Sequence, residues 1–205
     1  FERQSPPQYD RLSKLLARAV DAEPGSASIY PQLVNALQQV GDFEGAESAL
    51  EAYIEIVGED LQSKRGVADF KARQGQLTEA AQIREQLVGR SKEVVDAVAL
   101  ARIRQRMGDV AAAEAILTEI GASLRTSIER PEGAEYSREL LVDREMALLY
   151  ARDGRMEIAR TTLTKAEQRL SGARLNEVRA NIELAYGDVS AAMRIAEELV
   201  AKEGS

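Results

Sequence analysis

The amino-acid sequence predicts an all-α protein made of stacked pairs of antiparallel helices. Three observations lead to this fold class. Five glycines recur at separations of 34, 33, 46 and 33 residues: Gly41, Gly75, Gly108, Gly154 and Gly187. Each is followed two residues later by an apolar side chain and five residues later by alanine, and segments of helical period lie on both sides, as in 30–40 and 43–57. A fixed period of roughly 34 residues is typical of repeat arrays in which neighbouring units bury each other's apolar faces.

The glycines are predicted to end the first helix of each pair, and the residues after them to start the second. Glycine adopts the left-handed backbone conformation that commonly closes a helix. Asp42, Asp109 and Asp188 each follow such a glycine, where a carboxylate can accept hydrogen bonds from the first free N–H groups of the next helix. The alanine lies one turn into the second helix, where its small side chain lets the two helices approach closely.

These features make the sequence resemble the tetratricopeptide repeat (TPR) family. In that pattern, small or apolar residues precede the glycine on the first helix, a large or aromatic residue lies closer to it, and a proline often closes the unit. The matching positions are Leu33 and Val34, Val67 and Ala68, Leu100 and Ala101, Met146 and Ala147 with Tyr150, and Pro24 at the end of a preceding unit. Arg84 and Arg179 stand where the family usually has apolar residues. The resemblance implies a right-handed superhelical solenoid whose first helices line a concave groove, and a role in binding other proteins.

We expect one TPR-like solenoid over residues 1–205. Its predicted units are the second helix of a truncated repeat at 8–24 and five repeats at 27–60, 61–93, 94–128, 134–172 and 173–202. The long interval after Gly108 predicts a stretched helix ending near Ile128 and an inserted loop at 129–133. This insertion is either a hairpin or hinge that serves partner binding, or a lengthened repeat boundary, which costs little free energy. Because neither end has a capping helix, we expect a piece of a longer protein whose uncapped ends can self-associate.

The composition excludes most catalytic chemistry. The sequence has no histidine and no cysteine, which excludes serine–histidine triads, cysteine nucleophiles and the usual zinc sites. It has no Gly-x-x-x-x-Gly-Lys phosphate loop, and its carboxylates are expected on the solvated faces of amphipathic helices. No stretch reaches the roughly 20 apolar residues that span a bilayer. We therefore expect a non-enzymatic protein without a cofactor, a metal or a membrane-inserted segment.

Charge divides between the two helices of the predicted repeats. The net charge of −7 argues against binding of nucleic acid through its phosphates. Acidic residues gather in the second helix at 43–57, whereas arginines recur in the first helices of the next units. The residues that the resemblance places on the groove side are Asn35, Gln38, Gln39, Arg65, Asp69, Arg73, Arg102, Gln105, Arg106, Arg144 and Arg152.

Two interpretations of these arginines are open. Arginine binds carboxylates in a bidentate manner, so an acidic segment of a partner protein is the expected ligand. Alternatively, the arginines pair with Asp69, Asp143 and Glu145 and only keep the groove soluble. The carboxylate clamp that binds chaperone tails is not reproduced, because Pro31, Gly66, Val95 and Ala99 occupy its other positions beside Asn35.

Three functional classes follow, of which a protein-interaction scaffold is the first. The second is a periplasmic segment of a bacterial exopolysaccharide secretion or envelope-assembly machine, because similar TPR arrays precede outer-membrane export barrels; its groove could contact an anionic polysaccharide. Arginine outnumbers lysine 21 to 6 and cysteine is absent, which is typical of proteins from GC-rich bacteria. The resemblance to these envelope arrays slightly favours the bacterial periplasm over the cytoplasm. The third is RNA binding, because pentatricopeptide repeats share the helix-pair layout, although the acidic balance and the lack of a regular polar code argue against it.

Overall fold

The structure is a computed structural model, and it describes residues 7–91, 93–125, 133–170 and 175–203. Within these ranges the chain is helical and contains no strand, and consecutive helices pack in pairs. The all-α, helix-pair class that the sequence predicts is therefore confirmed. The chain divides into two compact units, Phe1–Ser91 (unit 1) and Lys92–Ser205 (unit 2), and each is described by itself.

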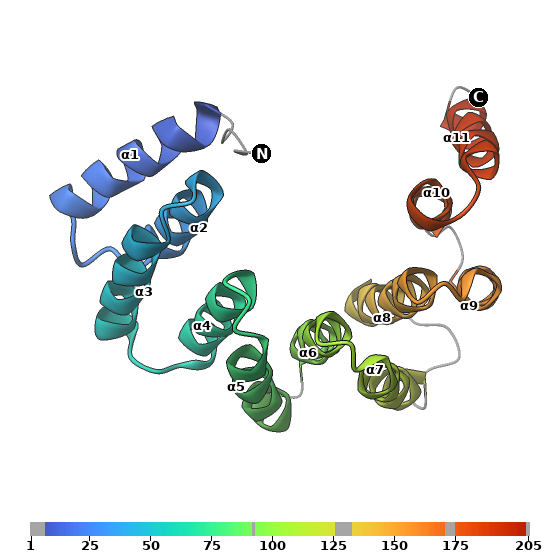
Figure 1. The fold of residues 1–205 in the computed structure, drawn as a ribbon, viewed down its shortest axis with the longest axis horizontal. Coiled ribbons are helices and arrows are strands. Elements are labelled where there is room, and N and C mark those ends of the chain that lie inside the picture. The colour runs from blue at the N-terminus through green and yellow to red at the C-terminus, as the bar shows by residue number, and fades with distance from the viewer. Residues whose placement is uncertain (1–6, 92, 126–132, 171–174, 204–205) are drawn as a thin grey trace. The chain divides into compact units, whose positions relative to one another are not determined.

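The described part of unit 1 contains five helices (Figure 1). They are α1 (Pro7–Ala22), α2 (Tyr30–Val40), α3 (Phe43–Val57), α4 (Leu61–Arg73) and α5 (Leu77–Ser91). Helices α2 and α3 form one pair and α4 and α5 form the next, while α1 packs against α2 and α3 packs against α4. Each helix therefore contacts its neighbours in sequence, because the short turns between helices of a pair leave only an antiparallel return.

Unit 2 continues the same alternation in its described residues. Its helices are α6 (Val94–Arg106), α7 (Val110–Arg125), α8 (Gly133–Arg152), α9 (Met156–Arg169), α10 (Leu175–Tyr186) and α11 (Val189–Glu203). The pairs are α6 with α7, α8 with α9, and α10 with α11, and the first helices also contact one another from pair to pair. The predicted helix end near Ile128 and the predicted loop at 129–133 lie outside the described residues, apart from Gly133, which begins α8.

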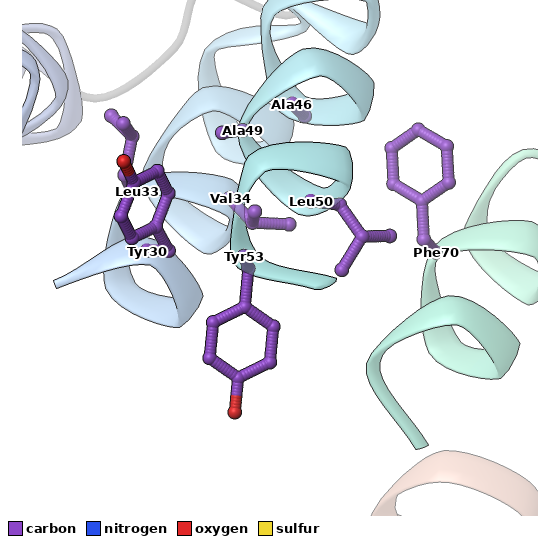
Figure 2. Close-up of a cluster of buried hydrophobic side chains, with 8 residues drawn as sticks. All are labelled: Tyr30, Leu33, Val34, Ala46, Ala49, Leu50, Tyr53 and Phe70. Atoms are coloured by element: carbon purple, nitrogen blue, oxygen red, sulfur yellow. The ribbon is translucent and has the colours of Figure 1, made fainter. Parts of the chain in front are cut away.

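The apolar core of unit 1 lies between successive helices. Its central cluster comprises Tyr30, Leu33, Val34, Ala46, Ala49, Leu50, Tyr53 and Phe70. Figure 2 shows Leu50 projecting from α3 toward α4, on which Phe70 lies. Two further clusters fill unit 2, one around Leu117 and Val142 and the other around Leu163 and Leu175. Because each cluster draws side chains from two pairs, no pair buries its apolar face alone.

The alanines that follow the five marker glycines are all buried. Ala46, Ala80, Ala113 and Ala159 have no exposed surface, and Ala192 is 6% exposed. This burial is what the predicted role of these alanines, close approach between the helices of a pair, requires. A larger side chain at such a position would have to displace the facing helix, because protein interiors are close-packed.

Four of the five marker glycines have the predicted backbone conformation. Gly41, Gly75, Gly108 and Gly154 have φ angles between 77° and 85°, in the left-handed region. The prediction is wrong for Gly187, which does not adopt a positive φ. A Cβ atom there would lie 2.2 Å from Oε2 of Glu183 and 2.6 Å from the methyl carbon of Met156. This glycine is therefore required by lack of space and not by backbone conformation.

The predicted helix-starting aspartates accept hydrogen bonds from main-chain N–H groups. Gly45 N–H donates to Asp42 at 2.9 Å, Ala112 N–H donates to Asp109 at 3.1 Å, and Ser190 N–H donates to Asp188 at 2.8 Å. Their role as helix N-caps is confirmed. Each satisfies an N–H group that the helix itself leaves without a partner.

Replacing Asp42 by alanine is expected to lower the free energy of unfolding by about 1 kcal/mol, because the cap of α3 is lost. The measurement is urea denaturation followed by circular dichroism. Glu47→Ala on the exposed face of the same helix is the matched control, with an expected change below about 0.5 kcal/mol. Equal effects of the two substitutions would contradict a capping role for Asp42.

Within the described ranges, no helix is long and apolar enough to cross a bilayer. In the same residues, no group of acidic, histidine or cysteine side chains is arranged to hold a metal ion.

Candidate partner-binding site

Unit 1 contains a small cavity between its α2–α3 pair and α4, here called the unit 1 cavity. Its volume is about 210 Å³. Its lining residues are Pro31, Val34, Asn35, Gln38, Leu50, Tyr53, Gln62, Arg65, Gly66, Asp69, Phe70 and Arg73. Four of the apolar members, Val34, Leu50, Tyr53 and Phe70, belong to the core cluster of Figure 2. The predicted residues Asn35, Gln38, Arg65, Asp69 and Arg73 thus lie around one apolar cavity.

Arg73 lies in the last turn of α4 and reaches back to α2. Its Nη1 donates a hydrogen bond to Oδ1 of Asn35 at 3.1 Å and a second one to Oε1 of Gln38. Both acceptors are neutral amide oxygens. They hold the guanidinium group in place and do not offset its charge, so the exposed Arg73 keeps its positive charge at the edge of the cavity.

Asp69, by contrast, has its charge balanced within unit 1. Arg84 Nη2 lies 2.6 Å from Oδ1 of Asp69, and Arg84 is only 4% exposed. Arg84 is one of the two departures from the TPR pattern, and its side chain runs from α5 to α4 to reach this carboxylate. Sequence reasoning missed the pair. The available signal was an arginine at a normally apolar position, which requires a charged partner when it is buried.

Unit 2 contains a larger and more open cavity between α6 and α8, here called the unit 2 cavity. Its volume is about 730 Å³. Its lining residues are Arg102, Gln105, Arg106, Val110, Arg144, Glu145, Leu148, Arg152 and Asp153. All five residues predicted in this part of the chain line it. Four arginines face two carboxylates, so the cavity carries an excess of positive charge.

The most buried carboxylate of the unit 2 cavity is bound by Arg102. Arg102 Nε donates to Oε2 of Glu145 at 2.8 Å, and the side chain of Glu145 is 3% exposed. Arg144 Nε lies 3.7 Å from the same carboxylate. The alternative interpretation, in which groove arginines pair with neighbouring acids, therefore applies to Arg102. A buried carboxylate of this kind depends on its partner, because an unpaired charge in the interior is very unfavourable.

Asp143, the other acid in that alternative, takes no part in the unit 2 cavity. It pairs with Arg125 of α7, on a different face of α8. Burial raises the pKa of the Asp143 carboxyl above its ordinary value, against the opposing effect of Arg125. The two acids on α8 thus belong to separate ion pairs, although only one residue separates them in sequence.

Arg152 is held in the same manner as Arg73. Its Nη1 donates to Oε1 of Gln105 at 3.0 Å, and its Nε donates to the hydroxyl oxygen of Tyr186 at 3.2 Å. Gln105 is itself fixed, since its Nε2 donates to the carbonyl oxygen of Leu149 at 3.3 Å. Both units therefore place an arginine two residues before a marker glycine and orient it with a glutamine from the preceding first helix.

The remaining predicted residue, Gln39, does not line either cavity. It lies on the exposed side of α2. Several lining residues were not predicted, including Pro31 and Gln62 in unit 1 and Asp153 in unit 2, whereas Glu145 was predicted only as a possible partner of the arginines. Pro31 and Gln62 are uncharged, so the charge pattern of the sequence does not single them out.

The comparisons with known proteins agree with this architecture. No protein-family model matches the sequence, and the search of curated proteins found no match. Among solved structures, the chain is similar to the nearly identical TPR-like repeats of a putative kinesin light chain from Podosopora anserina, with a TM-score of 0.61, 22% identity, and coverage of 87% of this chain and 90% of that one.

Two further solved structures are also similar to this chain. PilW, a type IV pilus biogenesis factor, matches with a TM-score of 0.61 and 14% identity over 94% of this chain and 85% of that one. The pilF protein of Pseudomonas aeruginosa matches with a TM-score of 0.54 and 17% identity over 94% of this chain and 83% of that one. At these identities the likeness shows the fold, which is TPR-like, as the sequence predicts.

Proposed function

We propose that this protein is a non-enzymatic scaffold for protein–protein interaction and that its unit 2 cavity binds an acidic segment of a partner protein. The observation that carries the proposal is the excess of arginine in that cavity. Of its two carboxylates, Glu145 is bound by Arg102, and Asp153 lies 2.6 Å from Arg155. The positive charges of Arg106 and Arg152 are therefore available to carboxylates of a ligand.

The cavity is also organised before a ligand arrives. Arg152 is oriented by Gln105 and Tyr186, and Arg102 is fixed on Glu145. Because these side chains stand on packed helices, binding loses less side-chain entropy than it would on a flexible loop. In unit 1, Arg73 is oriented by Asn35 and Gln38 in the same way. An acidic segment is thus the ligand class for which both units have matching donors.

Substituting Arg106 and Arg152 together by glutamate is expected to weaken binding of an acidic peptide by about tenfold or more, because two charge-assisted contacts are lost. The probe is a fluorescein-labelled peptide that alternates glutamate and serine, measured by fluorescence anisotropy at fixed salt. Arg102 is left unchanged, because a glutamate there would face the buried Glu145 and destabilise α6 and α8.

The matched control is Arg90→Glu with Arg138→Glu, which changes the net charge equally at exposed positions outside both cavities. Equal weakening by the two double variants would contradict the proposal, since general electrostatics would then explain binding. So would equal affinity for a peptide that has glutamine in place of glutamate. A polyuronate and a single-stranded RNA of equal charge are measured in parallel, and tighter binding of either one would favour the polysaccharide or the RNA function instead.

A further inference from the structure

Gly66 is a glycine that the fold of unit 1 does not need. It lies in the interior of α4, where glycine is less favourable than alanine, and its φ angle is not in the left-handed region. A Cβ atom on it would meet only Cδ1 of Leu50, at 3.5 Å, which is an ordinary van der Waals contact. Gly121 in α7 differs, because a Cβ atom on it would lie 3.3 Å from Cγ1 of Val142. This distance is shorter than most contacts that Cβ atoms make in proteins. Neither backbone conformation nor packing therefore explains Gly66.

The position of Gly66 on the unit 1 cavity supplies a reason. Gly66 is one of the lining residues, on the side where Leu50 and Phe70 lie. A side chain at position 66 would therefore occupy part of the cavity. The one atom within 4 Å of its Cβ position is Cδ1 of Leu50. One established use of glycine is to let a ligand approach the backbone closely. The glycine thus keeps an apolar cavity open at the expense of helix stability.

The size and lining of the cavity match one apolar side chain. Its volume of about 210 Å³ exceeds the roughly 150 Å³ of an apolar cavity that accepts benzene, and it is smaller than the roughly 300 Å³ at which small-molecule pockets begin. Its large apolar lining residues are Val34, Leu50, Tyr53 and Phe70, whose side chains are drawn in Figure 2 as members of the buried cluster. A leucine, methionine or phenylalanine side chain fits these limits.

The charge at the edge of the cavity indicates which group of the ligand lies next to its apolar side chain. Arg73 is held by the amide oxygens of Asn35 and Gln38, and the charge of Asp69 is balanced by Arg84. The edge is therefore positive, and a carboxylate adjacent to the inserted side chain would be bound by Arg73. We propose that the unit 1 cavity, taken by itself, is a site for one large apolar residue of an acidic segment, flanked by a carboxylate that Arg73 binds. This inference rests on the proposed function.

The test compares two labelled peptides of equal charge. Both alternate glutamate and serine, and one carries a leucine in place of the central serine. The protein is expected to bind the leucine peptide about tenfold more tightly, because a leucine side chain becomes buried. Gly66→Leu, which fills the cavity, is expected to abolish this preference and to leave the affinity for the serine peptide within about twofold, since the arginines remain.

Gly89 provides the matched control. It lies on the exposed side of α5, outside the cavity, and a Cβ atom there would meet no other atom within 4 Å. Gly89→Leu is expected to keep the tenfold preference. If Gly66→Leu does not fold, as judged by circular dichroism, Gly66→Ala replaces it, with an expected partial loss of preference and a rise in Tm that Gly89→Ala matches.

The outcomes separate this inference from the proposed function. Equal affinity for the two peptides, or an undiminished preference in the folded Gly66 variant, would overturn the apolar subsite and leave the acidic ligand in place. Failure to bind either peptide would instead overturn the acidic ligand, and the subsite with it. Loss of the preference in Gly66→Leu and its retention in Gly89→Leu would establish the subsite.

Discussion

Leu163→Ala is expected to lower the free energy of unfolding of unit 2 by about 2–5 kcal/mol. Leu163 of α9 is fully buried among Ala147, Ala151 and Leu175, which come from the two neighbouring first helices. Truncation removes apolar surface from the core and leaves a cavity that the flanking helices can fill only in part. The measurement is urea denaturation, together with amide hydrogen exchange resolved to single residues.

Hydrogen exchange adds a second expectation, because stacked helix pairs are stabilised mainly by their nearest neighbours. Protection should fall most in α8, α9 and α10 and remain nearly unchanged in α2 and α3 of unit 1. Val189→Ala is the control, since Val189 is 54% exposed and should change the free energy of unfolding by less than about 0.5 kcal/mol. A uniform loss of protection over both units would contradict stabilisation by local neighbours.

Gly187→Ala is expected to lower the free energy of unfolding by about 1–3 kcal/mol through overpacking and not through backbone strain. The new methyl group would overlap the Glu183 carboxylate, which has little freedom to move. Arg160 donates to both oxygens of that carboxylate at 2.6 and 2.9 Å, and the main-chain N–H of Asp188 donates to it at 3.2 Å. Displacing Glu183 therefore breaks three hydrogen bonds of a side chain that is only 4% exposed.

The pH dependence of the stability of Gly187→Ala tests whether displacement of Glu183 causes the loss. Hydrogen bonding to Arg160 holds the pKa of the Glu183 carboxyl below its ordinary value of 4.5. The resulting stabilisation is fully present above pH 4.5 and is lost as the pH falls through the lowered pKa of the folded state. The difference in stability between Gly187→Ala and the unchanged protein should accordingly narrow below about pH 4.5.

Gly154→Ala serves as the contrasting variant, because Gly154 has a φ of 77° and no atom within 4 Å of its Cβ position. Its loss of stability comes from backbone strain and should not change with pH in that window. If the two glycine variants show the same pH dependence, Glu183 is not the group that Gly187 accommodates.

Local features of the fold could be predicted from the sequence because their partners are close in the chain. Asp42 caps α3 through the N–H group of Gly45, and four marker glycines adopt the conformation that closes a helix. Ala46 and its equivalents are buried where the repeat places them. At Gly187 the predicted left-handed conformation is wrong, and the reason for the glycine is a contact that is distant in sequence. The methyl carbon of Met156, from another repeat, lies where a Cβ atom would stand.

The sequence alone determined the helix-pair architecture and the kind of residues at the candidate site. It placed arginines on first helices, and five of the predicted residues line the unit 2 cavity. Only the tertiary structure decided whether each of these arginines is paired with a carboxylate or with neutral groups. Arg102 meets the buried Glu145, whereas Arg73 and Arg152 meet amide oxygens. These partners lie 38 to 47 residues apart in the chain, so the packing of one repeat on the next decides which arginine meets a carboxylate and which is held by neutral amide oxygens.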